Sequence, residues 1–439
     1  MDLLEAYKQR LDVAERVYAK AHLNESMPKA KKLATAKCLE NINKFMNEAF
    51  DNSVGTQRSD LGQWKKFTLN LTTVALPNLI AYDLVIVYPM SSMSGYVTYV
   101  EYTAGSNKGT TKQGDVFNNP FKLGGVDTSY TSERVVETVA AEATEIKLSW
   151  TPVLKEAFTE VVDGVETKHD VKITKADGTV AFANMEADGV TVKGLAAGDR
   201  VAYIYDNVVI PQNDLPILNA QIKSIALVAK ARRIAVYYSQ IAAYQAKTDY
   251  GFDLGDQLAE KAVGQLNYEI DTEITDLLIT NASQDGDLVW SKTLPTGVSK
   301  TEHYEGFTEI VEIARQKIYD RTKRFAPNYM LIASNILPIL TFIKGFSAAP
   351  TGSINGPYFA GTLNGLKVFV TPNIEAGKFV IGVNGDDMMS SAAVYAPYMP
   401  VVPTQLLGYA DGGMSQGWST LYDLHLLNKD LLVAGRVTA

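Results

Sequence analysis

The sequence predicts an α+β fold in which one long helix organises the chain and a small all-β domain is inserted. Between Tyr250 and Ser283 apolar residues recur every three or four positions, which indicates one long amphipathic helix. Residues 144–207 combine short strand-like segments with repeated Asp-Gly turns, a pattern typical of a small all-β domain. After the long helix, helical and strand patterns alternate from Tyr304 to Tyr398, which indicates a compact α/β unit.

The composition argues against several classes of protein. The chain has 439 residues and a formal net charge of -8, so nothing marks it as a whole as a binder of nucleic acid or anionic membranes. Cys38 is the only cysteine, which leaves no intramolecular disulfide and no cysteine-based metal site. The first ten residues lack the apolar core of a signal peptide, and Pro327 and Pro338 interrupt a long uncharged stretch. We therefore expect neither secretion nor a membrane span.

Residues 1–65 are expected to form an N-terminal helical arm. Two segments with helical spacing are separated by a break at Pro28. Two helices around a break form an arm more easily than a core. Lys29, Lys31 and Lys32 make the start of the second helix basic, which fits either a solvated face or contact with a nucleic-acid backbone.

Residues 66–143 are expected to supply a strand and an extended loop. From Leu69 to Val87 the composition is apolar and β-branched, which favours a strand, and Tyr96–Tyr102 alternates as a strand should. The segment from Thr103 to Gly125 is rich in Gly, Asn, Thr and Lys. Because it has so few apolar anchors, we expect it to project from the protein as a long excursion.

Residues 208–302 are expected to hold the long helix and the strand that precedes it. The segment Ile222–Tyr238 reads as one long strand that leads towards the helix. Lys230, Arg232 and Arg233 form the densest basic group in the middle of the chain. They fit either pairing with a carboxylate of a neighbouring element or chain, or direct contact with DNA.

No set of residues has the spacing of a catalytic site. Gly413–Gly417 matches the Gly-x-Ser-x-Gly of a hydrolase nucleophile elbow, but a strand-like segment follows where that motif requires a helix. Asp423 and His425 follow Ser415 too closely to be the usual well-separated triad partners. The four histidines are scattered without metal-binding spacing. We therefore predict no catalytic residue and no enzymatic activity.

No metal or cofactor site is expected either. Four carboxylates line up on the long helix, but this is typical of the wet face opposite an apolar stripe: Glu269, Asp271, Glu273 and Asp276. The loop Gly105–Thr110 is similar to a phosphate-binding loop, yet it lacks a lysine after its second glycine and opens no helix. The projecting parts indicate instead a structural protein, since ordering them requires burial by other copies.

Several stretches are similar, in order, to one known family. They are Tyr88–Val97, Ala229–Leu278, Tyr329–Ser334 and Val394–Pro400. These stretches resemble the major capsid proteins of tailed bacteriophages of the T-even-like, contractile-tailed branch, which have the Hong Kong 97 phage capsid fold. The similarity runs over most of residues 70–438, whereas residues 1–65 do not align and the β insert is of a kind that varies among such proteins.

The resemblance implies a role for each part of the chain. The arm would be residues 1–65, the peripheral-domain strand with an extended loop over a neighbouring subunit 66–143, the inserted β domain 144–207, the peripheral domain with its spine helix 208–302, the axial domain 303–402, and C-terminal strands returning to the peripheral domain 403–439.

The resemblance also implies a function. The chain would be a structural major capsid protein that self-assembles into hexamers and pentamers of an icosahedral phage head enclosing double-stranded DNA. Its expected partners are other copies of itself, portal, scaffold and maturation protease, minor capsid or decoration proteins, and packaged DNA bound non-specifically, with no membrane. It would reside in the virion capsid after assembly in the host cytoplasm.

Two alternatives remain open at this point. An encapsulin-type nanocompartment shell protein shares the fold, but it usually lacks an insert of this size and needs a cargo-binding inner surface. A glycan-active enzyme would use the β insert for binding, but the sequence offers neither a signal peptide nor a convincing pair of catalytic carboxylates.

Overall fold

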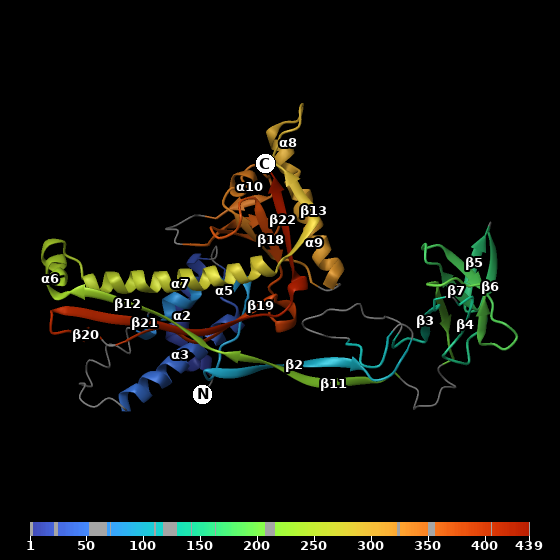
Figure 1. Cartoon of the computed structure of the whole chain (residues 1–439), viewed down its shortest axis with the longest axis horizontal. Helices are drawn as coiled ribbons and strands as arrows, with labels where there is room; N and C mark the ends of the chain where they lie inside the picture. Colours follow the sequence, from blue (N-terminus) through green and yellow to red (C-terminus); the bar gives the residue numbers. More distant parts are fainter. Residues whose placement is uncertain are drawn as a thin grey trace. The chain divides into compact units, whose positions relative to one another are not determined.

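A computed structural model of the chain contains two compact units (Figure 1). One unit is built from the N-terminal residues up to Thr98 and from the chain after Ser224, and the other from most residues between Tyr99 and Lys223. The structure describes residues 3–21, 25–51, 68–70, 72–108, 111–116, 130–141, 143–162, 164–206, 216–322, 325–349, 356–404 and 406–438.

The N-terminal region is helical, as its spacing predicts. Its helices are α1 (Leu3–Ala6), α2 (Lys8–Ala21) and α3 (Lys29–Asp51). Helix α2 buries Leu11, Ala14 and Tyr18 on one face, and α3 buries Leu39 and Ile42. Both helices are therefore amphipathic elements that pack against the rest of their unit.

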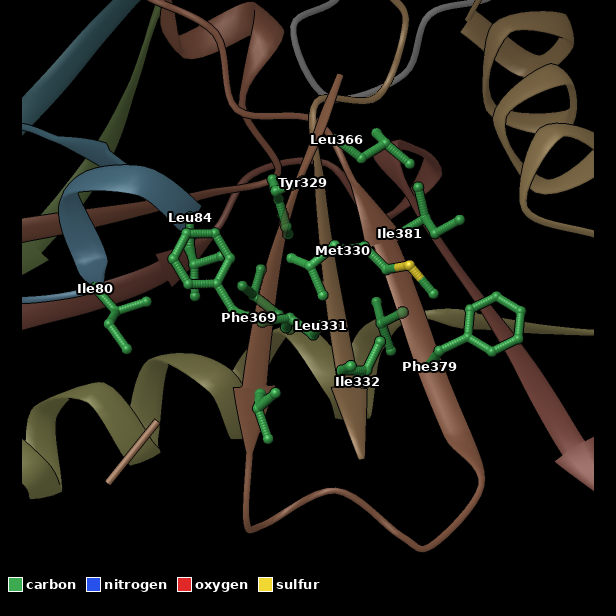
Figure 2. Packing of buried hydrophobic residues seen from close by; sticks show 14 of the residues in the cluster. Ile80, Leu84, Tyr329, Met330, Leu331, Ile332, Leu366, Phe369, Phe379 and Ile381 are labelled. Atoms are coloured by element: carbon green, nitrogen blue, oxygen red, sulfur yellow. The ribbon is translucent and has the colours of Figure 1, made fainter. Parts of the chain in front are cut away.

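The described part of residues 68–84 is mostly helical, so the strand expected there is wrong. Its named elements are η1 (Leu76–Asn78) and α5 (Ala81–Leu84), which precede the short strand β1 (Ile86–Val87). The hydroxyls of Thr72 and Thr73 donate to carbonyls one turn earlier, at 3.0 and 2.7 Å, so these β-branched residues are accommodated within a helix. Figure 2 shows Ile80 and Leu84 within the buried core cluster. Burial of this segment overrides its local preference for strand.

The long helix is confirmed as α7 (Leu254–Asn281), which follows the shorter α6 (Gln240–Asp249). The Asp253 carboxylate accepts the backbone N–H of Gly255 at 2.8 Å, as an N-cap should. From Ala262 to Leu278 the apolar residues of one face are buried. This helix lies along two sheets of its unit (Figure 1).

The first sheet brings together strands from distant parts of the chain. Its order is β1, β19 (Ala393–Pro403), β21 (Gly413–Leu426) and β12 (Lys230–Ser239), with β20 (Leu407–Gly408) paired to β21. Strands β12 and β21 are antiparallel, with Ile234 opposite Trp418. Leu266 of α7 packs in one cluster with Val401 and Trp418, which fixes the helix on this sheet.

The single strand expected over Ile222–Tyr238 is in fact two strands. β11 (Leu218–Val228) pairs with β2 (Ser94–Ala104) in a two-stranded ribbon, whereas β12 joins the first sheet. Between them the N–H of Ala229 donates to the carbonyl of Met93 at 2.8 Å. The chain stays extended across the break, so periodicity alone does not reveal the change of partner.

The second sheet and its helices confirm the predicted α/β unit. The sheet runs β13 (Ser283–Ser291), β22 (Leu432–Thr438), β18 (Lys378–Gly382), β14 (Tyr329–Ala333), β17 (Leu366–Thr371), β16 (Tyr358–Leu363) and β15 (Phe346–Ala348). The helices in this part of the sequence are α8 (Lys300–Glu305), α9 (Phe307–Thr322), α10 (Leu337–Leu340), η3 (Met388–Ser390) and η4 (Lys429–Leu431). Every residue of β14 is buried (Figure 2). Phe307 of α9 meets Phe379 of β18 edge-on, with ring centroids 5.5 Å apart. These contacts place the largest apolar core between the sheet and its helices.

The second unit contains the predicted all-β domain. Its strands are β3 (Arg134–Thr138), β4 (Glu145–Lys147), β5 (Phe158–Val162), β6 (Val165–His169), β7 (Val171–Thr174), β8 (Val180–Ala183), β9 (Thr191–Lys193) and β10 (Arg200–Ile204). Four of them form a sheet in the order β3-β10-β7-β8 around a small core that includes Val135, Val171 and Tyr203. Strand β3 precedes residue 144, so the small sheet begins upstream of the expected insert.

The excursion expected from Thr103 to Gly125 is wrong for its first half. Ala104, Lys108 and Thr111 are buried within the second unit. Thr103 pairs with Val116 in an isolated bridge, which closes the described part of the loop. Residues 117–129 lie outside the described part of the chain. Polar residues hold this loop by hydrogen bonds, which a search for apolar anchors does not detect.

Candidate functional site: charged clusters and exposed apolar faces

The predicted basic group on β12 divides into two kinds of residue. Arg232 extends towards α7, where its guanidinium donates to Glu269 at 3.3 Å and to Glu273 at 2.5 Å. Lys230 and Arg233 are exposed and make no ion pair with any residue that the structure describes. The pairing expected with a neighbouring element therefore holds for Arg232.

The Arg232 pair is part of a larger hydrogen-bonded network. The hydroxyl of Tyr422 on β21 also donates to Glu273, at 2.5 Å. The Arg232 guanidinium lies 5.8 Å from the centroid of the Tyr422 ring, within range of a cation–π contact. The network joins β12, β21 and α7, so it stabilises the packing of the long helix on the first sheet.

Of the predicted basic residues of α3, Lys31 lies in a second charged cluster, around Asp83. Lys31 Nζ lies 3.5 Å from the Asp83 carboxylate and 3.2 Å from the Tyr18 hydroxyl. Burial lowers the pKa of Lys31, and the nearby Asp83 carboxylate opposes that shift. Lys32 pairs with Glu15 of α2 at 2.8 Å.

Lys29, the third predicted basic residue of α3, is exposed and forms no ion pair within the described ranges. It therefore differs from Lys31 and Lys32, whose charges are already opposed by acidic groups of the same chain.

The Asp83 cluster lines a cavity of about 220 Å³. Lys367 of β17 enters it from the second sheet and lies 3.5 Å from Asp83 and 2.7 Å from Glu25. The amide of Asn384 donates to the Asp83 carbonyl at 2.8 Å. Because its lysines pair with carboxylates of the same chain, the cluster holds the N-terminal helices against the second sheet. The sequence does not predict this cluster, because its residues come from segments that are far apart in the chain.

One of the four carboxylates expected on the wet face of α7 is buried instead. Asp271 is 8% exposed, and its Oδ1 accepts the backbone N–H of Ile80 at 3.1 Å. Its partner lies at the start of α5, whose N–H groups need an acceptor. Helical spacing predicts that Asp271 faces solvent, because spacing within one helix contains no information about the segment around Ile80 that covers this position. No group of residues that could hold a metal ion occurs in the described ranges.

The nucleophile-elbow match lies in a strand. Ser415 is part of β21 and pairs with Tyr237 of β12, so it is not at a strand-to-helix turn. His303 stacks on Trp290 with ring centroids 4.7 Å apart and contacts the carbonyl of Ser291 at 2.9 Å. His425 is exposed on β21, and His22 lies outside the described residues. Ser415 is therefore part of a strand, and these histidines lie in ordinary structural or surface positions.

Large apolar side chains lie exposed on the ribbon and on α6. On one face of β2, Tyr96 is 69% and Val100 42% exposed. On β11, Ile222 is 77% exposed, and on α6 Ile241 and Tyr244 are 72% and 71% exposed. The sequence analysis did not predict these exposed surfaces. The one signal for them is that β2 carries apolar residues on both of its faces, which indicates that both faces are covered in the assembled protein.

These features define the class of protein. The described charged clusters join elements of the fold, and apolar faces of a thin ribbon and a short helix lie in solvent. Exposed apolar faces of this kind are typical of a structural protein that is completed by other chains, whereas the charged clusters stabilise the fold of the single chain. No described helix has the combination of length and apolar character that crossing a bilayer requires.

Comparison with known proteins agrees with this class. The family model described as Major capsid protein Gp23 matches residues 61–430. The chain therefore belongs to the Gp23 major capsid protein family, and it is a structural protein of a bacteriophage capsid.

Individual relatives are distant. The chain is 23% identical to the major capsid proteins of Escherichia phage AR1 and Enterobacteria phage T4, over 75% of this chain and 68% of each relative. A solved structure from Microbacterium phage Oxtober96 is similar at a TM-score of 0.38 and 11% identity, over 82% of this chain and 90% of that chain. The helical arm, extended ribbon, long helix and α/β unit agree with the Hong Kong 97 phage capsid fold that the resemblance implies.

Proposed function

We propose that this chain self-assembles into hexamers and pentamers of an icosahedral phage head that encloses double-stranded DNA. Membership of the Gp23 family supports this function. It also favours a phage head over an encapsulin-type nanocompartment. The strand placement of Ser415 and the structural pairing of the α7 carboxylates favour a protein without enzymatic activity, and hence disfavour a glycan-active enzyme.

The exposed face of β2 carries the proposal. Tyr96, Val100 and Tyr102 alternate along the strand, point to one face and are exposed. A ribbon of two strands is only marginally stable in water, and an aromatic face left in solvent favours association. A neighbouring copy that covers this face would bury it and stabilise the ribbon at the same time.

The parts of the chain then take the following roles in the shell. We assign the N-terminal arm to 1–65, the peripheral-domain strand and extended loop to 66–143, the inserted β domain to 144–207, the peripheral domain with its spine helix to 208–302, the axial domain to 303–402 and the returning C-terminal strands to 403–439.

Assembly would involve further partners. We expect portal, scaffold and maturation protease during assembly in the host cytoplasm, minor capsid or decoration proteins on the shell, and non-specific contact with packaged DNA. Lys29, Lys230 and Arg233 are the predicted basic residues best suited to a phosphate backbone, because they are exposed and unpaired among the described residues. Lys31, Lys32 and Arg232 are less suited, since they face carboxylates of their own chain.

The test is imaging of the purified protein together with its particle mass. The unmodified chain should form closed particles or capsomer rings, whereas a Tyr96→Ser, Val100→Ser double variant should remain folded by circular dichroism yet assemble poorly. Thr98→Ser, on the same exposed face, is the matched control and should assemble normally. A stable monomer of the unmodified chain under all assembly conditions would refute the function, and normal particles from the double variant would refute the role of this face.

A further inference from the structure

The glycine-rich loop that begins at Gly105 contains a deeply buried lysine, Lys108. Lys108 is 2% exposed, which is unusual for this residue type. No carboxylate among the described residues lies within ion-pair distance of its ammonium group. Because burial of a charge is costly unless the charge is satisfied, the surroundings of Lys108 must replace both water and a counter-ion.

The surroundings supply two acceptors and two aromatic rings. Lys108 Nζ donates to the carbonyl of Ser132 at 2.6 Å and to the hydroxyl of Tyr205 at 2.9 Å. It lies 4.8 Å from the centroid of the Tyr205 ring and 5.3 Å from that of Trp150. Carbonyl and hydroxyl oxygens accept from an ammonium group, and the faces of Trp and Tyr attract a cation.

The site is built independently of the lysine that enters it. The rings of Trp150 and Tyr205 lie 5.3 Å apart at centroid, so they contact each other directly. Tyr205 is 2% exposed, and it pairs with Val153 in an isolated bridge. The backbone of Tyr205 also donates to the carbonyl of Glu133 at 3.1 Å. The rings are therefore held by strands and turns of the small β domain.

The loop presents the lysine from a defined backbone. The backbone groups of Lys108 and Thr111 exchange hydrogen bonds of 3.0 and 3.1 Å. The Asn107 side chain accepts the N–H of Gln113 at 2.6 Å. The hydroxyls of Ser106 and Tyr130 lie 3.0 Å apart, which joins the loop to the chain that enters the small sheet. Lys108 thus reaches the rings from a loop whose described residues on both sides of it, 104–107 and 111–116, are hydrogen-bonded.

We propose that Trp150, Tyr205 and the Ser132 carbonyl form a binding site for a primary alkylammonium group, and that Lys108 of the same chain occupies it. The occupied site locks the described loop residues, 104–108 and 111–116, onto the small β domain. All groups belong to one unit of one chain, so this inference does not depend on the proposed shell function. It also gives a structural role to the glycine-rich loop, whose sequence does not fit a phosphate-binding loop.

Chemical rescue tests the proposal on the full chain. Lys108→Ala should lower the melting temperature and make protease cleavage within residues 104–116 faster by about tenfold or more, since two cation–π contacts and two hydrogen bonds are lost. Propylammonium chloride at millimolar concentration should restore slow cleavage, whereas 1-propanol at matched ionic strength should not. Lys112→Ala, which removes an exposed lysine of the same loop, should behave as the unmodified chain in every condition.

The outcomes separate recognition of charge from simple filling of space. Rescue by propylammonium alone supports the site, while equal rescue by propanol, or no rescue by either compound, overturns it. If Lys108→Ala does not fold, Lys108→Met retains most of the volume without the charge. Faster cleavage of the loop in Lys108→Met supports the proposal, and cleavage at the rate of the unmodified chain overturns it.

Discussion

The Asp271 carboxylate accepts the backbone N–H of Ile80 at 3.1 Å inside the main core. This bond joins the middle of α7 to the start of α5, two elements that are far apart in the sequence. Burial raises the pKa of Asp271 to about 8, although the backbone N–H groups of Ile80 and Ala81 act in the opposite direction. The protein therefore holds an acid that is protonated in the fold over part of the physiological pH range.

This acid predicts a pH-dependent stability. An Asp in the unfolded chain has a pKa of about 3.9, so between about pH 4 and pH 8 the folded protein holds a proton that the unfolded chain has released. The contribution of Asp271 to the free energy of unfolding should consequently fall as the pH rises through this window and stay level above it. Urea unfolding of the unmodified chain and of Asp271→Asn across pH 4–9 measures this contribution.

The Asp271→Asn variant should lack this part of the pH dependence while retaining an oxygen that can accept from Ile80. Asp249→Asn, at the exposed end of α6, is the matched control and should keep the pH dependence of the unmodified chain. Parallel curves for the unmodified chain and Asp271→Asn would contradict the predicted protonation.

Arg232 should stabilise the packing of α7 on the first sheet. Arg232→Gln removes its bonds to Glu269 and Glu273 and should lower the free energy of unfolding by about 1–2 kcal/mol, as expected for partly buried charged hydrogen bonds. Arg233→Gln, one residue along and exposed, should leave it unchanged within error. Equal effects of the two substitutions in denaturant titrations would show that the network contributes no stability of its own.

Asp83 should be needed to hold Lys31 and Lys367 in the cavity at the start of α3. Asp83→Asn leaves Lys31 and Lys367 close together without their shared carboxylate, and we expect a loss of about 3 kcal/mol in the free energy of unfolding. Asp386→Asn changes an exposed carboxylate that lines the same cavity and serves as the control. Equal melting temperatures of the two variants would show that the Asp83 carboxylate does not stabilise this cluster.

Ile270 should tolerate no charge. It is 1% exposed on the buried face of α7, so Ile270→Asp places an unpaired carboxylate in the main core and should destabilise the fold by more than about 4 kcal/mol. Gln257→Asp introduces the same group on an exposed turn of the same helix and should remain soluble and folded. Circular dichroism and the soluble fraction after expression measure both variants, and an unaffected Ile270→Asp would mean that this face of α7 is not buried.

Much of the fold was predictable because local patterns are consistent with it. The spacing of Ile270, Ile274 and Leu278 predicts α7, and the strand β14 lies in the stretch whose alternating helical and strand patterns predict the α/β unit. The segment around Thr72 and Thr73 was assigned wrongly, since its β-branched composition favours strand while its packing against the core favours helix. The candidate sites were less predictable, because each is assembled from residues that are distant in the chain.

Local sequence patterns are sufficient to predict the α+β class, the long helix, the all-β insert and the resemblance to phage capsid proteins, because each depends on the periodicity or order of neighbouring residues. The pairing of charges is visible in the folded chain alone: Arg232 with the α7 carboxylates, Lys31 and Lys367 with Asp83, and Lys108 with two aromatic rings. Whether a charge is solvated, paired or buried depends on groups that folding brings close together, and no local pattern contains them.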